Sequence, residues 1–417
     1  MNFREQIKRY APSIAKSAFI GARSRFAAPP LEEIKVHDYA ALPDAGSEPR
    51  LNLVIPSVSA NAAFGGVTTG IDVFLSLAAE AGFQLRILLD DFESERDRKA
   101  VDKRAAKLGL DSTRIEIVPR SREVPQVPVR ARDLFLSYNW WLTLSLTGLV
   151  EQQAKIFDRP LLPLLPLIQE YEPAFYPFSS THMMARLAFD SLWPTWGIFN
   201  SSLLYDYFIS QKHSVDRAYI LEPKLSDDLR QFLDAGTKKK RRILIYGRPT
   251  VQRNCFSLIE AGLAQWAATD PQARNWELLS AGVQHKPIPL ANGQSLRSVG
   301  KLSMDDYGKM LQDTAIGVSL MSSPHPSYPP LEMAHFGIRT ITNAFANKDL
   351  SQTHGNIVSL RDVRAPAIAQ AIGNECRAFD ANPAEGWNHC NPDSSFLKTG
   401  PFDFIETLAR DMAAVVK

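Results

Sequence analysis

Short apolar runs alternate with runs of helical period along most of this chain. Residues 51–56 (Leu-Asn-Leu-Val-Ile-Pro) predict a strand, residues 67–81 a helix and residues 85–89 a second strand. Further strands are expected at 115–118, 134–137 and 154–157. Strands that alternate with helices of this length are typical of βαβ units, so we expect a parallel sheet.

A second series of the same kind begins after the basic run 238–242. Ser303 is expected to cap one of its helices, whose first turn carries Asp305 and Asp306. The boundary between the two series lies near residues 223–241. The sequence therefore predicts an α/β protein with two Rossmann-like domains, whose parallel sheets face each other across a ligand-binding cleft. The strands of the second series are expected at 243–246, 278–281, 316–320 and 340–342, and its helices at 256–267, 304–311 and 330–336.

The beginning of the chain has a different character. Apolar residues recur at helical spacing in residues 1–25, which carry six basic side chains and one acidic side chain, Glu5. Two interpretations stay open: a solvated helix packed on the domain, or a basic amphipathic segment drawn to anionic lipid at about 1 kcal/mol per basic residue. Lysine and arginine interrupt the apolar stretch, which does not fit a signal peptide. Residues 31–50, rich in proline, are expected to connect this segment to the first domain.

Composition narrows the class of protein. The chain has 417 residues, 45% of them apolar and 22% charged, which suits two globular domains. A net charge of +2 gives no strong attraction to nucleic acid, and three cysteines argue against a disulfide framework or a zinc site. The apolar, uncharged run 134–150 falls short of the ~20 apolar residues of a membrane span. We expect a cytoplasmic protein, with any contact to the inner face of the cytoplasmic membrane made through residues 1–25.

Two arginines lie in a loop between a predicted strand and helix, where residues 246–254 read Tyr-Gly-Arg-Pro-Thr-Val-Gln-Arg-Asn. Gly247 permits a sharp turn, so Arg248 and Arg253 can converge on the end of the sheet. A diphosphate is bound by permanently charged groups with several donors, beside free backbone N–H groups. The alternative is a pair of solvated loop arginines.

A second candidate segment, 322–337, follows an apolar strand and opens a short helix with prolines, which are tolerated in a first turn. We expect Glu332 in that first turn. There it would either stabilise the helix dipole, at about 0.3–1 kcal/mol, or accept hydrogen bonds from ribose hydroxyls. Tyr328 would contact the nucleotide or fill the core. Gly282 ends a strand on the cleft side, and Lys301 lies where backbone groups could pair with a base edge, although a solvated lysine explains it equally.

The N-terminal half offers weaker candidates. Gly65 and Gly66 would let the backbone approach a ligand, or form a plain tight turn; they lack the third glycine of the dinucleotide fingerprint. Glu170 and Glu172 would orient an acceptor hydroxyl, pair with Arg186 or lie exposed. Four aromatic residues could form a sugar-stacking platform or belong to the core: Trp140, Trp141, Phe175 and Tyr176.

These segments carry a family resemblance. Gly247-Arg248 with Arg253 is similar to the Gly-Arg…Lys-Gly phosphate loop of family 4 retaining glycosyltransferases, and 330–337 resembles that family's Leu-Glu-Ala-Met-Ala-Cys-Gly helix. The more particular likeness is to the WsaF-like rhamnosyltransferases of bacterial surface-glycan assembly. It rests on Gln-Glu-Tyr-Glu-Pro-Ala-Phe-Tyr-Pro at 169–177, Asn-Ser-Ser-Leu-Leu at 200–204 and the string 323–332, and covers roughly residues 50–365.

The resemblance implies a GT-B fold with a nucleotide diphosphate sugar, most specifically dTDP-L-rhamnose, in the C-terminal domain. Glu332 would then contact the ribose, and Arg248 and Arg253 would act catalytically on the diphosphate. Pro329, Leu331 and the other nucleotide-side candidates would complete the site. In the general family, seven residues separate two glutamates; counted back from Glu332, the first falls at position 324, where this chain has Pro324.

On this interpretation the chain divides into an N-terminal segment and linker (1–50), an acceptor domain (51–230), a donor domain (240–395) and a C-terminal helix (396–417) expected to pack back on the acceptor domain. The reaction would use neither metal nor cofactor, because the chain contains no Asp-x-Asp and its histidines form no convincing ligand set. It would retain the anomeric configuration, and the acceptor would be a growing surface polysaccharide or a lipid-linked glycan. Two alternatives stay open: a GT-B sugar-nucleotide epimerase and a non-catalytic scaffold of a polysaccharide assembly complex.

Overall fold

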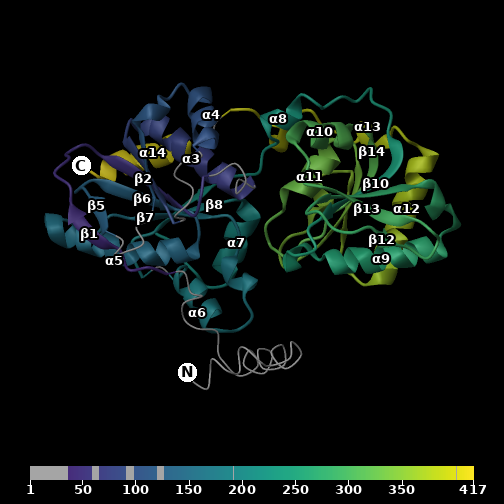
Figure 1. Cartoon of the computed structure of the whole chain (residues 1–417), viewed down its shortest axis with the longest axis horizontal. Helices are drawn as coiled ribbons and strands as arrows, with labels where there is room; N and C mark the ends of the chain where they lie inside the picture. The colour runs from purple at the N-terminus through teal and green to yellow at the C-terminus, as the bar shows by residue number, and fades with distance from the viewer. Residues whose placement is uncertain (1–35, 59–64, 91–97, 120–125, 191, 401) are drawn as a thin grey trace, which may run out of the picture.

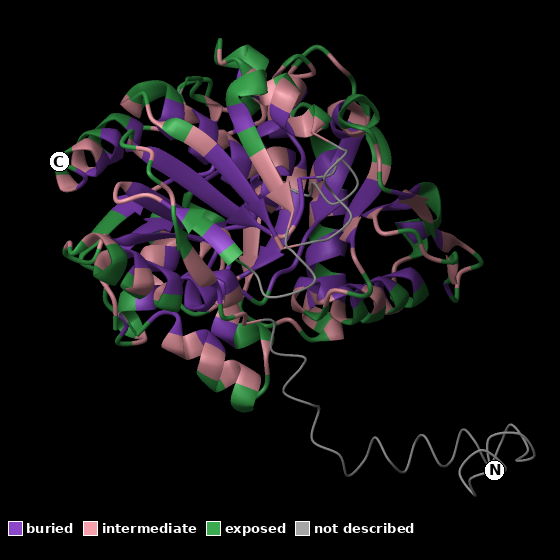
Figure 2. Cartoon of the chain, turned by 60° about the vertical axis from the view of Figure 1, so that its left-hand side comes forward, coloured by how far each residue is buried: buried purple, intermediate pink, exposed green. Residues whose placement is uncertain are grey.

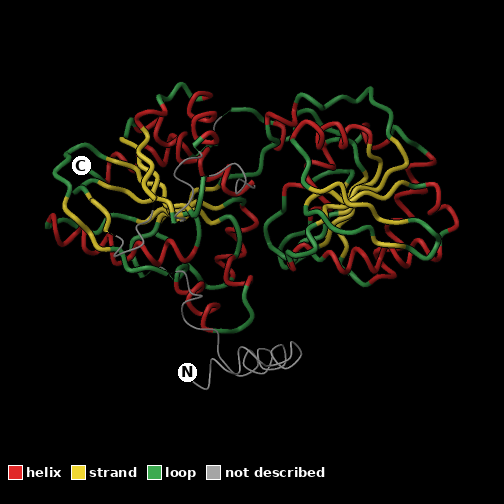
Figure 3. Tube along the Cα trace, in the orientation of Figure 1, coloured by secondary structure: helices red, strands yellow, loops and turns green. Residues whose placement is uncertain are grey.

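The computed structural model describes residues 36–58, 65–90, 98–119, 126–190, 192–400 and 402–417. Within these residues the strands form two seven-stranded sheets and one two-stranded sheet. Each large sheet belongs to its own domain and has helices on both faces, and the two domains lie side by side (Figure 1). The tube in Figure 3 shows the two groups of strands separated by helices and loops. The predicted α/β class with two parallel sheets is confirmed.

The N-terminal sheet has the order β4-β3-β2-β6-β7-β8-β9, and its neighbouring strands are parallel. The chain reverses its direction of winding between β2 and β6, so their carboxyl ends form the switch point where ligands of such sheets bind. The strands are β2 (Arg50–Ile55), β3 (Gln84–Leu89), β4 (Ile115–Pro119), β6 (Asp133–Ser137), β7 (Leu164–Ile168), β8 (Trp196–Phe199) and β9 (Arg217–Ile220). The helices are α3 (Gly65–Ala81), α4 (Lys99–Lys107), α5 (Trp140–Phe157), α6 (Ser180–Leu187) and α7 (Ser202–Ser210), with the short 3-10 helices η3 (Ser112–Arg114) and η4 (Glu172–Phe175).

The C-terminal sheet has the order β12-β13-β11-β10-β14-β15-β16, in which only the β12–β13 pair of the described strands is antiparallel. Its switch point lies between β10 and β14. The strands are β10 (Lys240–Gly247), β11 (Glu277–Gly282), β12 (Ile288–Pro289), β13 (Ser295–Gly300), β14 (Thr314–Val318), β15 (Arg339–Asn343) and β16 (Ile357–Leu360). The helices are α9 (Phe256–Thr269), α10 (Met304–Asp313), α11 (Tyr328–His335), α12 (Ala365–Ala381) and α13 (Glu385–Asn388), with η5 (Gln252–Asn254), η6 (Pro271–Asn275), η7 (Leu350–Gln352) and η8 (Ser395–Leu397).

The central strands are buried along their whole length, as in β2 and β14. Parallel strands covered by helices on both faces need apolar side chains on both faces, which explains why they appear in the sequence as continuous apolar runs. Figure 2 shows the buried strands at the centre of the molecule and exposed residues on the outer helices. Ser303 caps α10 as predicted, because its side chain accepts a hydrogen bond from the Asp306 N–H.

The chain crosses between the domains twice. It first passes through α8 (Asp227–Arg230), whose Leu229 is buried in the core of the C-terminal domain. It then returns after η8 to α14 (Ile405–Val415), which packs against α3. Leu408 and Met412 of α14 are buried in the N-terminal core, and the Tyr219 hydroxyl donates a 2.6 Å hydrogen bond to Asp411.

The observed elements differ from the predicted ones in several places. The strand predicted at 154–157 is wrong, because these residues form the last turn of α5, which ends at Asp158 in the left-handed region (φ 50°). Part of the expected connecting segment is a strand: β1 (Ala40–Pro43) pairs in parallel with β5 (Gln126–Val129). The prediction for residues 1–25 falls outside the described residues. Among the helices that the structure does describe, none has the length and apolar character needed to cross a membrane.

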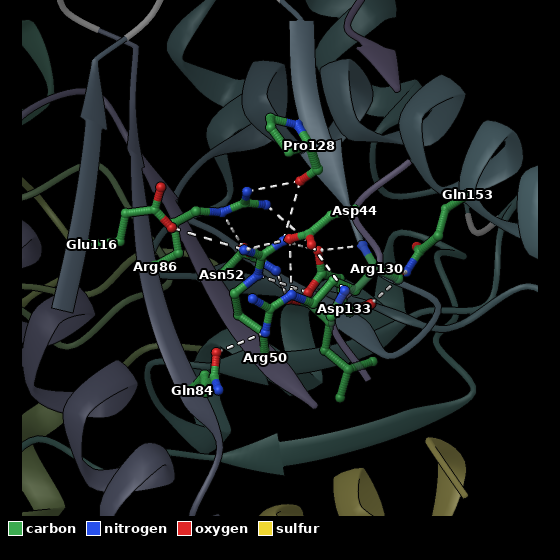
Figure 4. Close-up of polar contacts among 12 residues, drawn as sticks. Asp44, Arg50, Asn52, Gln84, Arg86, Glu116, Pro128, Arg130, Asp133 and Gln153 are labelled. Atoms are coloured by element: carbon green, nitrogen blue, oxygen red, sulfur yellow. Dashed lines mark hydrogen bonds and ion pairs between the residues drawn. The ribbon is translucent and has the colours of Figure 1, made fainter. Parts of the chain in front are cut away.

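A buried ionic network stands at the amino ends of the N-terminal strands (Figure 4). The Asp133 carboxylate, at the start of β6, accepts hydrogen bonds from Arg50 Nε (2.9 Å) and Nη2 (2.7 Å), and Arg86 Nη2 lies 3.5 Å away. Arg86 also donates to Asn52 and to the Pro128 carbonyl, both at 2.7 Å. Through Pro128 the network joins the β1–β5 pair to the main sheet. It lies at the edge of the sheet opposite the switch point.

Candidate functional site

The carboxyl ends of the two sheets meet at a junction between the domains. Here the Ser323 hydroxyl, after β14, donates a hydrogen bond to the Glu170 carboxylate, after β7. The Tyr328 hydroxyl at the start of α11 lies 3.4 Å from Asn200 Oδ1, after β8. We call the groups that meet here the domain junction. Because both switch points open toward it, it is the place where a ligand of either domain would bind.

Two glycines shape the donor side of this junction. A Cβ on Gly247 would lie 1.8 Å from Ser280 Oγ, and a Cβ on Gly282 would lie 2.3 Å from the Gly247 carbonyl oxygen. Gly282 also has a φ of 142°, a conformation that glycine adopts readily and other residues do not. The Val283 N–H donates to the Gly247 carbonyl at 2.8 Å, so the ends of β10 and β11 are held close together.

Arg248 and Arg253 lie on the loop that follows Gly247, and both are half-buried. Arg253 points to the other domain: its Nε lies 4.0 Å from Glu170 Oε1, and its guanidinium lies 4.6 Å from the centre of the Phe175 ring. Its carbonyl accepts a 2.8 Å hydrogen bond from the Ser322 N–H, which ties this loop to the segment before α11. The structure therefore brings Arg253 to the junction together with a carboxylate that competes with any bound anion.

Glu332 lies in the second turn of α11, because the helix begins at Tyr328 rather than at the predicted residue 330. The prediction that it lies in the first turn is wrong, and the explanation by the helix dipole loses its basis, since that effect fades beyond the first turn. Tyr307 of α10 donates a 3.0 Å hydrogen bond to Glu332 Oε2. Burial raises the pKa of this carboxyl to about 7.

The remaining donor-side candidates are spread around this centre. Tyr328 contacts the N-terminal domain, and burial raises its pKa to about 12. Pro329 is half-buried and Leu331 is buried, both in α11. Lys301 is exposed and follows Gly300, which ends β13 with a φ of 67°. The structure thus gathers most of these candidates on α11 and leaves Lys301 at the surface.

On the acceptor side, Glu172 accepts a 2.6 Å hydrogen bond from the backbone N–H of Trp140, the first residue of α5. Burial raises the pKa of Glu172 to about 8 and that of Glu170 to about 7. Neither carboxylate pairs with Arg186 among the described contacts; Arg186 donates instead to the Tyr171 hydroxyl at 3.1 Å. Trp140 belongs to the core, since it is buried and packs edge-on against Tyr176.

The two N-terminal glycines begin α3. A Cβ on Gly66 would lie 2.7 Å from the Tyr138 hydroxyl and 2.9 Å from Gln169 Oε1. Gly66 therefore lets Tyr138 and Gln169 come to the start of the helix, next to Glu170.

Sequence reasoning missed three residues at the junction. Tyr138 follows β6, and burial raises its pKa to about 12. Lys348 is fully buried, donates a 2.9 Å hydrogen bond to the Met321 carbonyl and has a pKa lowered to about 8 by burial. His325 was considered only as a metal ligand. His325 lay inside a conspicuous string, but nothing around Lys348 in the sequence separates it from a surface lysine.

The arrangement is suited to binding an anion between the domains. Arg253 and Lys348 supply positive charge near the start of α11, and Glu332 supplies a hydrogen-bond acceptor on the same helix. Two carboxyls with raised pKa values face them from the other domain. Among the described residues, no group of three or more histidine, cysteine, aspartate or glutamate side chains is arranged to hold a metal ion.

Comparisons with known proteins identify the family and the fold of the chain. A family model described as the WsaF N-terminal domain matches residues 50–202, and one described as the WsaF C-terminal domain matches residues 241–373. The O-antigen biosynthesis protein RfbC of Myxococcus xanthus is 29% identical over 188 residues, which is 45% of this chain but only 14% of that relative's length.

Solved structures resemble the chain over nearly its whole length. WaaG, a glycosyltransferase involved in lipopolysaccharide biosynthesis, matches with a TM-score of 0.54 and 12% identity, over 88% of this chain and 99% of its own. The pneumococcal O-GlcNAc transferase GtfA, in complex with UDP and GlcNAc, matches with a TM-score of 0.54 and 9% identity, over 89% and 99%. Sucrose-phosphate synthase from Thermosynechococcus elongatus gives a TM-score of 0.51 at 14% identity, over 88% and 98%. These likenesses confirm the predicted GT-B fold.

Proposed function

The chain belongs to the WsaF family, and from that premise we propose that it is a glycosyltransferase of bacterial surface-polysaccharide assembly. It would move a sugar from a nucleotide diphosphate donor to a glycan acceptor. The observation that carries the proposal is the domain junction, where Arg253 and Lys348 of one domain face the carboxyls of Glu170 and Glu172 of the other. Such a site can hold an anionic donor and an acceptor hydroxyl together.

The donor domain would bind the nucleotide diphosphate. Gly247 and Gly282 let the ends of β10 and β11 pack closely, with Ser280 Oγ and the Gly247 carbonyl where Cβ atoms would be, and the arginine loop starts from this packed end. Arg248 and Arg253 would neutralise the charge that grows on the diphosphate as the sugar leaves, each charge-assisted hydrogen bond contributing about 1.5–3 kcal/mol. Glu332, held by Tyr307, would accept a hydrogen bond from a ribose or deoxyribose hydroxyl. Tyr328, Pro329, Leu331 and Lys301 would line the nucleotide.

The acceptor would bind on the other side, near Gly65, Gly66, Glu170 and Glu172. We propose that the reaction retains the anomeric configuration, with the departing phosphate oxygen taking the acceptor's proton on the same face. Glu170 would then position the acceptor hydroxyl. The anomeric configuration of the product, read by NMR, distinguishes this from inversion, in which Glu170, with a pKa of about 7, would take the proton itself.

The donor sugar is proposed to be L-rhamnose, carried by dTDP, on the strength of the family likeness. The arginines would neutralise the charge of the leaving diphosphate in place of a metal ion, so a chelator should leave turnover unchanged. Residues 1–25, outside the described structure, would bring the protein to the inner face of the cytoplasmic membrane, where it would meet a lipid-linked acceptor. Binding to vesicles with and without anionic lipid tests that contact.

Calorimetric titration of the whole protein with dTDP, UDP, GDP and their sugars tests the donor assignment. We expect tight binding of one nucleotide sugar, and its loss in Arg248→Ala and Arg253→Ala. Arg297→Ala is the matched control, because Arg297 is 60% exposed and pairs with Glu277 away from the junction. A double arginine variant that binds and turns over like the wild type would sink the proposal. Release of an altered sugar nucleotide without acceptor would show an epimerase, and donor binding without turnover would point to a scaffold.

A further inference from the structure

His325 is a buried side chain of which one ring nitrogen forms a hydrogen bond. It lies between β14 and α11 and is only 4% exposed. Its Nδ1 accepts a 2.9 Å hydrogen bond from the Ser327 N–H, and its own backbone N–H donates to Ser323 Oγ at 3.0 Å. Among the described residues nothing forms a hydrogen bond with its Nε2, which is shielded from solvent.

These contacts determine the protonation state of the ring. A backbone N–H can only donate, so Nδ1 must carry a lone pair and the proton must be on Nε2. Burial and the positive charges of Lys348 and Arg253 lower the pKa of His325 to about 3, so the ring stays neutral at physiological pH. His325 therefore presents a fixed N–H donor to which no residue of the described part of the chain offers an acceptor.

A buried donor without a partner is energetically unfavourable. Buried polar groups in folded proteins are almost always hydrogen-bonded, and leaving one without a partner destabilises the fold. The surroundings indicate what the partner would be. Ser323, next to the ring, is bonded across the domain junction to Glu170, and the charges of Arg253 and Lys348 act on the ring. A positive environment of this kind favours an oxygen acceptor that is negatively charged or strongly polar.

We propose that His325 is a donor-binding residue whose Nε2–H donates a hydrogen bond to an oxygen at the sugar-phosphate end of the nucleotide sugar. The inference rests on the proposed function and adds a residue to it. The oxygen belongs either to the terminal phosphate or to a hydroxyl of the sugar ring. It reaches His325 when the Ser323–Glu170 contact opens and the ligand takes the place of the Glu170 carboxylate.

Two substitutions separate this role from a purely structural one. His325→Asn keeps an acceptor near the position of Nδ1, so the hydrogen bond from Ser327 survives while the Nε2–H donor is lost. His325→Gln keeps a donor near the position of Nε2 but loses the acceptor. We expect the asparagine variant to melt near the wild-type temperature and to bind the nucleotide sugar roughly 10- to 100-fold more weakly, and the glutamine variant to bind within several-fold of the wild type. His389→Asn, at a half-exposed histidine beside Asn356, is the matched control.

The free nucleoside diphosphate serves as the second ligand. If His325→Asn binds both the diphosphate and the nucleotide sugar more weakly, the acceptor oxygen belongs to the phosphate. If it binds only the nucleotide sugar more weakly, the acceptor oxygen belongs to the sugar. Should the asparagine variant fail to fold, ¹⁵N-histidine NMR of the wild type replaces it: the Nε2–H resonance of His325 should shift on adding the nucleotide sugar.

Three results would overturn the inference. His325→Asn could bind the nucleotide sugar as tightly as the wild type. Both variants could lose affinity equally and melt at lower temperatures, or the Nε2–H resonance could stay unmoved when the ligand is added. If the wild type binds no nucleotide sugar at all, the proposed function fails and this inference fails with it. Normal wild-type binding with an unaffected asparagine variant removes only the role of His325.

Discussion

Replacing Asp133 by asparagine tests the energetic role of the buried network in the N-terminal domain (Figure 4). Asp133 is fully buried, and its carboxylate also accepts a 3.0 Å hydrogen bond from the Arg130 N–H. Arg50 and Arg86, which flank it, are 4% and 1% exposed. A neutral amide would leave these two guanidinium groups without their buried counter-charge. Burial already lowers the pKa of Arg86 to about 10, which shows that the charged form is poorly solvated there.

The size of the destabilisation depends on the carboxylates that still lie near the two arginines. The other carboxylates near Arg50, Asp44 at 3.4 Å and Glu116 at 3.8 Å, are 27% and 57% exposed and replace little of the lost attraction. Removing one partner of a buried ion pair costs about 3–5 kcal/mol. For a domain of this size, 1 kcal/mol shifts the melting temperature by about 2–4 °C, so Asp133→Asn should melt roughly 6–20 °C lower.

Scanning calorimetry of the whole chain measures this shift. Glu116→Gln is the matched control, because it removes a carboxylate of the same network that is mostly in water, and should change stability by less than about 1 kcal/mol. Since the network lies at the edge of the sheet opposite the domain junction, nucleotide binding at low temperature should be unchanged in both variants. A melting temperature for Asp133→Asn as close to the wild type as that of the control would refute the reasoning.

Two further predictions concern the donor side of the junction. Gly282→Ala should weaken nucleotide binding at least 10-fold by titration calorimetry and lower the melting temperature, because the new Cβ meets the Gly247 carbonyl at 2.3 Å and the φ of 142° strains any other residue by about 1–3 kcal/mol. Gly148→Ala, in α5 with open space around it, should do neither, and equal behaviour of the two variants would contradict the steric argument. Glu332→Gln should change the pH dependence of the unliganded protein. The pKa of Glu332 is about 7 in the folded state and lies near 4.5 when unfolded, so the wild type loses stability relative to the glutamine variant as pH rises from about 4.5 to 7. Urea unfolding of both proteins across that range measures the difference, and parallel pH curves would show that Glu332 is not buried as described.

The strands at the centre of each sheet could be predicted because buried strands appear in the sequence as apolar runs. β2 and β10 are buried on both faces and appear as short apolar runs between turn residues. The same signal failed at residues 154–157, since a run of four residues cannot tell a strand from the last turn of a helix. It also missed β7, whose Leu-Leu-Pro-Leu-Ile contains Pro166 in a central position, where proline normally argues against a strand.

The site was predicted as far as it lies in local motifs. Gly247, Arg248 and Arg253 follow one strand, and Glu332 follows another, so their convergence could be expected from the fold class. The turn of α11 that holds Glu332 could not, because the helix begins two residues earlier than its prolines suggest. Lys348 becomes part of the junction only through tertiary structure, which brings a residue without a local signal under the segment before α11.

The return of the chain to its first domain affects how the protein can be divided. α14 begins 185 residues after the end of β9, yet its Leu408 and Met412 complete the core beneath α3. A fragment ending at the first crossing would expose the apolar face of α3 to water, and a fragment starting there would carry an amphipathic helix with nothing to cover it. Expressing either domain alone therefore requires joining residues 402–417 to the N-terminal part, so the folding unit here is discontinuous along the chain.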